Sequence, residues 1–186
     1  MKRLFDIAVS ATLIGLLSPV FLGVALAVRV TSRGPVIYAS RRIGRKNKIF
    51  LMHKFRTMRA DTPQVATHLL SDPGLFLTPI GGFLRKSSLD ELPQLLDVIA
   101  GSMSLVGPRP ALFNQDDLIS LRSAAGVDSL LPGITGWAQV NGRDGLSIPA
   151  KVDYDIHYLR NKSIALDAYI LLLTALKVFR RDGVSH

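Results

Sequence analysis

The longest apolar run of the chain lies near its N-terminal end. Ile7 to Val28 is 22 residues without a charged side chain. As a helix this run would be about 33 Å long, close to the thickness of the hydrocarbon core of a bilayer. A signal peptide is disfavoured, because the run is long and no small-residue cleavage site leads into a polar mature start. A straight helix that spans the bilayer stays open as an alternative.

Two features of this run favour a bent helix over a straight span. Ser18-Pro19 falls in its middle, where proline removes a backbone hydrogen bond and the serine hydroxyl can satisfy the freed carbonyl. Both flanks are basic, and positive flanks belong on the cytoplasmic side of a membrane. These flanking residues are Lys2, Arg3, Arg29, Arg33, Arg41 and Arg42. We therefore predict that residues 1–30 form a re-entrant membrane helix, broken at Ser18-Pro19, and that residues 31–186 form a domain on the cytoplasmic face.

Beyond residue 30 the pattern predicts an α+β fold that is mostly helical, with a small β-hairpin. Two short strands, Val36–Ala39 and Ile49–Met52, flank the basic hairpin tip 41–48. Trp137–Val140 is expected to be extended, and the polar segment 61–79 to hold a short helix at 64–70 and to act as a lid. Apolar periodicity predicts helices, some of them amphipathic and interfacial, at residues 88–99, 116–125, 151–158 and 164–181.

The charge of the chain is distributed unevenly. The net charge is +9, and residues 1–60 hold twelve Lys/Arg and the single acid Asp6, whereas residues 61–186 carry a slight acidic excess. The basic excess therefore adjoins the most apolar segment, which favours an anionic membrane surface as partner over nucleic acid. The absence of cysteine excludes disulfides and thiolate chemistry.

Adjacent acids stand out at the expected start of the helix over 88–99. Ser88 and Glu91 have capping-box spacing, and Pro93 fits a first helical turn. Asp90 and Glu91 would then lie at the positive end of a helix, which keeps a carboxylate ionised and favours a phosphate nearby. Read alone, this stretch is most simply a helix cap.

Basic residues elsewhere suggest anion binding. Arg109 lies between two prolines, which fix the backbone and hold the guanidinium at a set angle that suits a phosphate. The alternative is a rigid loop whose arginine pairs with a nearby acid. Lys54 and Arg56 would share one face of an extended segment at the end of the hairpin.

These motifs together resemble the small monotopic phosphoglycosyl transferases, the catalytic core of the bacterial sugar transferase family. The resemblance covers essentially the whole chain. It rests on the basic-flanked helix with Ser18-Pro19, on the segments 54–58 and 85–94, and on the motifs 104–110 and 132–143. Each is weak alone, but together they are highly specific.

The resemblance implies a reaction and roles for particular residues. A UDP-linked sugar would give its sugar-1-phosphate to undecaprenyl phosphate with release of UMP. Asp90 would attack the phosphate and form a covalent intermediate, and Glu91 with Asp90 would hold Mg²⁺, for which Mn²⁺ could substitute. These roles agree with general chemistry, because a carboxylate can act as the nucleophile toward a phosphoryl group and Mg²⁺ prefers hard oxygen ligands. The expected phosphate, nucleotide or sugar contacts are Lys54, Arg56, Arg85, Arg109 and Arg143.

The expected setting is the cytoplasmic face of the bacterial inner membrane, with anionic lipids as partners and no nucleic acid. The compact size favours an N-acetylated amino sugar, such as diacetylbacillosamine, GalNAc or GlcNAc, over glucose or galactose, by analogy within the family. A homodimer stays open. Two other classes remain as alternatives, namely a non-catalytic basic membrane scaffold and a DNA-binding membrane protein.

Overall fold

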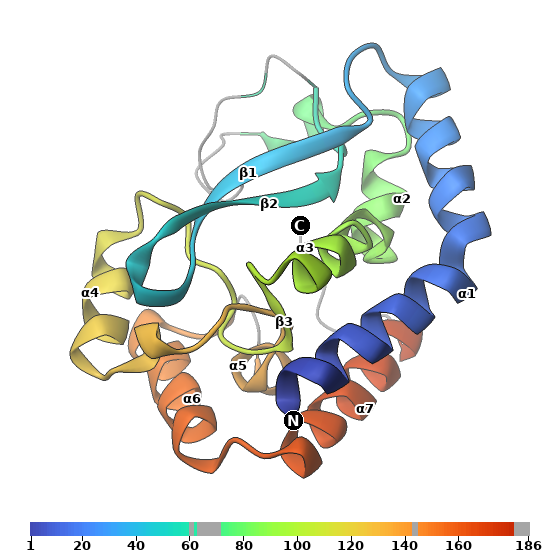
Figure 1. The fold of residues 1–186 in the computed structure, drawn as a ribbon. Helices are drawn as coiled ribbons and strands as arrows, with labels where there is room; N and C mark the ends of the chain where they lie inside the picture. Colours follow the sequence, from blue (N-terminus) through green and yellow to red (C-terminus); the bar gives the residue numbers. More distant parts are fainter. Residues whose placement is uncertain (60–61, 63–71, 143–144, 181–186) are drawn as a thin grey trace.

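The computed structural model describes residues 1–59, 62, 72–142 and 145–180. The described part is mostly helical and carries two small two-stranded sheets (Figure 1). Its helices are α1 (Lys2–Thr31), α2 (Gly81–Lys86), α3 (Gln94–Ala100), α4 (Asp116–Ala124), α5 (Trp137–Asn141), α6 (Ile148–Asn161) and α7 (Ile164–Arg180). The strands are β1 (Ile37–Ile43), β2 (Ile49–Phe55), β3 (Ser104–Val106) and β4 (Gly133–Thr135). Short 3-10 turns are η1 (Arg45–Asn47), η3 (Pro73–Phe76), η4 (Leu89–Glu91) and η5 (Val127–Ser129).

Helix α1 is bent but not interrupted. It runs from Lys2 to Thr31 with Pro19 inside it, and the ribbon bends partway along its length (Figure 1). Pro19 has no N–H to donate to the carbonyl of Gly15, and the hydroxyl of Ser18 donates to that oxygen instead, at 2.9 Å. The expected helix–break–helix is therefore one continuous helix whose freed carbonyl is satisfied locally. By length and composition, α1 is the one helix of the described residues that could cross a membrane.

Both ends of α1 contact the same domain. At the N-terminal end Lys2 pairs with the buried Asp167 of α7 at 2.6 Å. Arg3 donates to the carbonyls of Val98 and Ile99, at 2.5 and 2.9 Å, and so caps the C-terminal end of α3. The other end is held through the backbone of residues 32 and 33, which accept hydrogen bonds from Arg56.

The expected hairpin is present and longer than the sequence indicated. Strands β1 and β2 pair antiparallel from Ile37↔Phe55 to Ile43↔Ile49. Tyr38 and Lys54 are therefore direct partners, and alternate residues share a face. One such face carries Tyr38 and Arg42 of β1 and Lys54 of β2.

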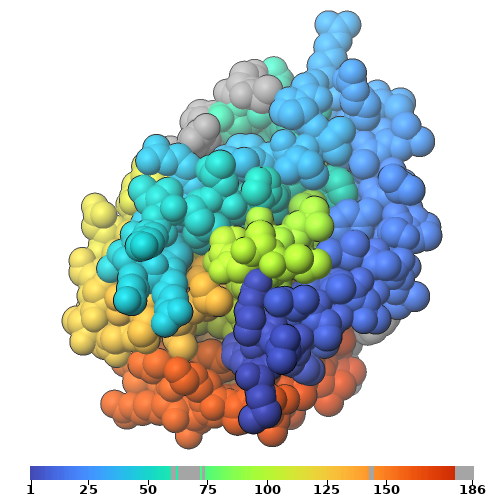
Figure 2. Space-filling view, viewed as in Figure 1, coloured from blue at the N-terminus to red at the C-terminus, as the bar shows by residue number. Residues whose placement is uncertain are grey.

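The core lies where α3 meets the other elements. Leu95 and Val98 of α3 are buried together with Met103, Leu105 and Val106. Apolar residues of α1 and α7 pack against this cluster, and in Figure 2 α3 lies between the hairpin and α1. Helix α3 therefore connects the long apolar helix α1 to the rest of the domain.

Several local predictions can be compared with the described residues. Helices at 116–124, 148–161 and 164–180 agree with the pattern, and the hydroxyl of Ser163 accepts from the N–H of Leu166 as an N-cap. The expected extended segment at 137–140 is wrong, because these residues form α5. Its Trp137 stacks on His157 of α6 at 5.6 Å between ring centroids, a contact between segments that are distant along the chain. The helix expected at 64–70 lies outside the described residues. Of the segment 61–79 that we expect to act as a lid, residues 62 and 72–79 are described and include η3, and the lid itself stays a prediction.

Candidate active site

Asp90 lies in the 3-10 turn η4, ahead of α3 and separate from it. Ser88 precedes this turn in the left-handed region, with φ of 56°, and makes no side-chain capping bond. The expected capping box is therefore absent. A left-handed conformation at a non-glycine residue is strained, and such strain gathers at functional sites. Here it turns the chain directly before the two acids.

Glu91 and Asp90 meet Lys54 from strand β2. The Lys54 ammonium is 2.7 Å from Glu91 Oε1 and 3.8 Å from Asp90 Oδ2. Arg109 reaches the same Glu91 Oε1 from the loop after β3, at 3.2 Å. Residues far apart in the sequence thus bring two carboxylates and two cations into one cluster.

Arg85 is a third cation close enough to Asp90 for their charges to interact. Its Nε donates to the hydroxyl of Thr57 at 3.0 Å, which orients the guanidinium. Burial lowers the pKa of Arg85, and the charge of Asp90 partly offsets this lowering. The arginine is therefore desolvated beside a carboxylate, as a phosphate-binding group would be.

Burial raises the pKa of the Asp90 carboxyl above its ordinary value of 3.8. The nearby charges of Lys54, Arg85 and Arg109 oppose this rise, and that of Glu91 adds to it. Asp90 is thus a poorly solvated carboxylate held beside cations, which increases its nucleophilic character.

The loop that carries Arg109 is fixed by close backbone packing. Strands β3 and β4 pair in parallel, which the sequence did not predict. A Cβ on Gly107 would meet the carbonyl oxygen of Leu131, and one on Gly136 would meet the carbonyl oxygen of Gly107. The glycines of the two motifs are therefore required by the approach of two backbone segments.

A buried ion pair holds the same loop from its far side. Arg122 of α4 lies 2.7 Å from the carboxylate of Asp155 on α6, which is 1% exposed. The second guanidinium nitrogen of Arg122 donates to the carbonyl of Arg109 at 2.8 Å. Asp155 therefore orients Arg122, and Arg122 positions the backbone of Arg109.

The family profile of the bacterial sugar transferases matches residues 1–181. The chain belongs to the bacterial sugar transferase family. It is 41% identical over its whole length to "Uncharacterized sugar transferase EpsL" of Bacillus subtilis (strain 168), covering 91% of that protein. It is 39% identical over 96% of its length to "UDP-glucose:undecaprenyl-phosphate glucose-1-phosphate transferase" of Escherichia coli (strain K12). It is 38% identical over 98% of its length to "Undecaprenyl-phosphate galactose phosphotransferase" of Salmonella typhimurium.

The extent of the match differs among these relatives. The chain spans nearly all of the Bacillus protein but about 40% of the length of the glucose and galactose relatives. The bacterial sugar transferase fold of this chain is therefore shared with a region of each of those two longer proteins.

Among the described residues, three of the expected anion-binding side chains of this sugar transferase meet near Asp90 and one does not. Lys54, Arg85 and Arg109 belong to the cluster. Arg56 turns away, because its guanidinium donates to oxygens of Ser32 and Arg33 at the end of α1. Arg143 lies outside the described residues.

Arg42 lies beside the site, although no motif in the sequence indicated a role for it there. It lies on the hairpin face that carries Tyr38 and Lys54. Its guanidinium donates to the carbonyl of Pro110 at 3.4 Å. Burial lowers the pKa of Arg42 to about 10, and the charge of Arg109 contributes to the lowering. The alternation of β1 from Tyr38 to Arg42 was the signal that could have revealed it.

The donor set at Asp90 and Glu91 fits a shared divalent cation. Mg²⁺ is usually held by one or two carboxylates together with substrate phosphates and water. Among the described residues no group of three acidic, histidine or cysteine side chains could form an all-protein metal site. Two adjacent carboxylates within a cationic cluster therefore suit a metal that arrives with a diphosphate.

We expect the Arg122–Asp155 pair to affect turnover through Arg109. In the double variant Arg122→Leu/Asp155→Leu both charges disappear together, so folding should be little affected, because replacing a buried pair by apolar groups is often neutral. The carbonyl of Arg109 loses a charged donor, and turnover should fall about tenfold. The measurements are kcat, KM for the nucleotide sugar and the unfolding midpoint.

The single variant Arg122→Leu serves as the contrast. It leaves Asp155 buried without its partner and should cost about 3–5 kcal/mol of stability. If the stable double variant kept full kcat and KM, the pair would have no positioning role.

Proposed function

We propose that the chain transfers a sugar-1-phosphate from a UDP-sugar to undecaprenyl phosphate through a covalent intermediate on Asp90. The observation that carries the proposal is the buried Asp90 carboxylate, which lies beside Glu91 and is surrounded by Lys54, Arg85 and Arg109. A nucleophile for a diphosphate needs both ionisation and neighbouring cations, because the electrophile carries negative charge.

The proposed reaction has two displacements at one phosphorus. A carboxylate oxygen of Asp90 attacks the phosphorus that bears the sugar, the P–O bond to UMP breaks, and UMP leaves with the electron pair. An oxygen of undecaprenyl phosphate then attacks the same phosphorus, and Asp90 is released as a carboxylate. The products are UMP and undecaprenyl diphosphate sugar.

The cations of the site have separate roles in this scheme. Lys54 and Arg109 hold Glu91 and face the incoming diphosphate, and Arg85 neutralises charge beside Asp90. A Mg²⁺ ion held by Glu91 and Asp90 would supply charge neutralisation on the diphosphate. Arg143 remains our candidate for a nucleotide or sugar contact.

Glucose or galactose is the sugar that we propose to test first. Two of the relatives described above are named for a sugar, one for glucose and the other for galactose. An N-acetylated amino sugar, favoured by compact size, stays a prediction without support from those names. UMP release with undecaprenyl phosphate and a panel of UDP-sugars decides between them. No release with any UDP-sugar would contradict the proposed function.

We also propose that α1 is re-entrant and places the domain on the cytoplasmic face of the inner membrane. Ion pairs and hydrogen bonds tie both of its ends to one domain, through Lys2 and Arg3 at one end and Ser32 and Arg33 at the other. A helix that spans the bilayer places its two ends on opposite sides of the membrane. The contacts of one end with the domain would then be broken. The bend at the middle of the apolar run fits entry into one leaflet.

This topology gives a direct labelling prediction. The chain has no cysteine, so Leu4→Cys and Pro35→Cys in separate proteins report the two ends of α1. We expect a membrane-impermeant thiol reagent to label neither residue on intact cells and both after the membrane is opened, because both ends are cytoplasmic.

The variant that alters the bend is the control for this experiment. Ser18→Ala/Pro19→Ala restores a regular helix and should favour a span. Labelling of Leu4→Cys but not Pro35→Cys on intact cells, in the otherwise unaltered protein, would show that α1 spans the bilayer.

A further inference from the structure

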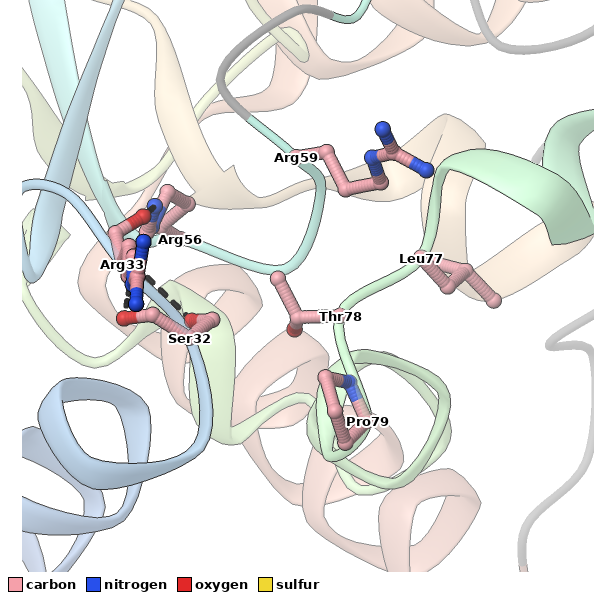
Figure 3. Close-up of a pocket in the computed structure, with 7 residues that line it drawn as sticks. All are labelled: Ser32, Arg33, Arg56, Arg59, Leu77, Thr78 and Pro79. Carbon is pink, nitrogen blue, oxygen red and sulfur yellow. Dashed lines mark hydrogen bonds between the residues drawn. The ribbon is translucent and has the colours of Figure 1, made fainter.

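One cavity of the described residues lies apart from Asp90 and Glu91. It has a volume of about 360 Å³ and is lined by Ser32, Arg33, Arg56, Arg59, Leu77, Thr78 and Pro79. In Figure 3, Ser32, Arg33 and Arg56 lie on one side, Arg59 and Leu77 on the other, and Thr78 between them. Neither acid of the proposed catalytic pair lines it.

Arg56 gives this cavity a buried positive charge. Its side chain is 4% exposed, and its acceptors are the carbonyl and hydroxyl oxygens of Ser32 and the carbonyl of Arg33. These acceptors are all neutral, so they satisfy two of the guanidinium nitrogens without balancing the charge. The third nitrogen, Nε, is buried and has no hydrogen-bond partner among the described residues. A buried charge without a counter-ion is costly, and an anion in the adjoining cavity would offset that cost.

Two more guanidinium groups border the same cavity. Arg33 and Arg59 both line it, and no acid is among the described residues that do. Arginine is the side chain best suited to bind a phosphate, because its planar donors match two phosphate oxygens. The chemistry of the cavity therefore fits a phosphate group.

The position of the cavity indicates where that phosphate comes from. It begins at Ser32, directly after the last turn of α1. Leu26 and Val30 on this end of α1 are 65% and 75% exposed, as lipid-facing residues would be. With α1 in the bilayer, the cavity lies at the level of the lipid headgroups.

We propose that this cavity binds the phosphate of an anionic bilayer phospholipid, at a site separate from that of the acceptor lipid. The inference rests on the proposed membrane placement of α1. The bound headgroup balances the charge of Arg56 and fixes the end of α1 against the domain. Arg33 and Arg59 hold the phosphate, and Arg56 anchors the wall of the site through residues 32 and 33.

Native mass spectrometry of the detergent-solubilised protein with added phosphatidylglycerol tests the site. Arg33→Gln/Arg59→Gln removes two phosphate-binding groups and leaves Arg56 in place. We expect one retained phosphatidylglycerol on the wild type, and about a tenfold weaker affinity in the double variant. Arg29→Gln/Arg45→Gln is the matched control. It removes the same charge from one residue in α1 and one in the hairpin tip, neither of which lines the cavity, and should change the affinity less than about twofold.

Three outcomes would overturn the proposal. Equal loss of phosphatidylglycerol in both double variants would mean general charge attraction. Displacement of the phospholipid by undecaprenyl phosphate, or retention of undecaprenyl phosphate alone, would assign the cavity to the acceptor. Turnover in detergent separates this test from the proposed function, because UMP release by the Arg33→Gln/Arg59→Gln variant would persist even if the lipid site were absent.

Discussion

Asp90→Asn should abolish UMP release, with a loss of at least about 1,000-fold in turnover. The neutral amide cannot attack phosphorus as a carboxylate does, so the covalent sugar-phosphate adduct should also be absent. The measurements are UMP release with undecaprenyl phosphate and a UDP-hexose, and intact-protein mass spectrometry after incubation with the donor alone. Asp153→Asn, at an exposed position on α6, is the control and should keep full activity and the adduct.

The same substitution should make the protein more stable at neutral pH. Burial raises the pKa of Asp90 above its value in the unfolded chain, and this effect exceeds the attraction of Lys54, Arg85 and Arg109. The folded state therefore binds the proton more tightly, so the contribution of Asp90 to stability is present at acid pH and is lost as the pH rises through the folded-state pKa. Asparagine carries no charge at any pH, so the variant does not lose this stability as the pH rises.

Thermal unfolding across the pH range tests the sign of this effect. Asp90→Asn should raise the unfolding midpoint at pH 7, with the advantage shrinking at acid pH. The wild-type turnover should fall on the acid side as Asp90 takes up a proton. A variant that is inactive and less stable at pH 7 would contradict the view that Asp90 is a carboxylate held ionised at a cost in folding free energy.

Removal of divalent cations should abolish turnover. Among the described residues the site has two adjacent carboxylates, Asp90 and Glu91, that could hold a cation, and no larger group of ligands is present. A diphosphate donor needs a cation of this kind because its negative charge must be neutralised. Excess EDTA should stop UMP release, and Mg²⁺ or Mn²⁺ should restore it. Glu91→Gln should raise the concentration of Mg²⁺ needed for half-maximal rate as well as lower the maximal rate.

The control for metal removal is a structural measurement. The unfolding midpoint should change little in EDTA, because the fold of the described residues is held by apolar packing and side-chain hydrogen bonds. Full UMP release in excess chelator would rule out a metal in the reaction. An unaltered Mg²⁺ requirement in the Glu91→Gln variant would show that Glu91 is not a metal ligand.

Features that depend on neighbours along the chain could be predicted from the order of the amino acids. The apolar run and its central Ser18-Pro19 specify a long helix with a bend, because a proline and the hydroxyl before it act on one carbonyl four residues away from the proline. Two short apolar runs around a basic tip indicated the hairpin, and periodicity with the Ser163 cap indicated the last helix. These are short-range effects, so they can be derived without knowing the fold.

Which charged side chains meet depends on how distant segments pack in the fold. Lys54 and Glu91 are 37 positions apart, and their contact depends on how the hairpin packs beside η4. Arg42 and Arg56 look equivalent in a basic segment, yet docking of β1 on residues 110–112 carries Arg42 to the site. The turn after β2 carries Arg56 to the end of α1 instead.

The same reason explains the misjudged local elements. Ser88 has capping-box spacing, but it adopts a left-handed conformation and leaves Asp90 in a separate turn. Trp137 belongs to the short helix α5, and its ring stacks on His157 of α6. Parallel pairing of β3 with β4 joins segments about 30 residues apart. In each case the free energy of long-range packing exceeds a weak local preference, and no pattern within the segment reports that packing.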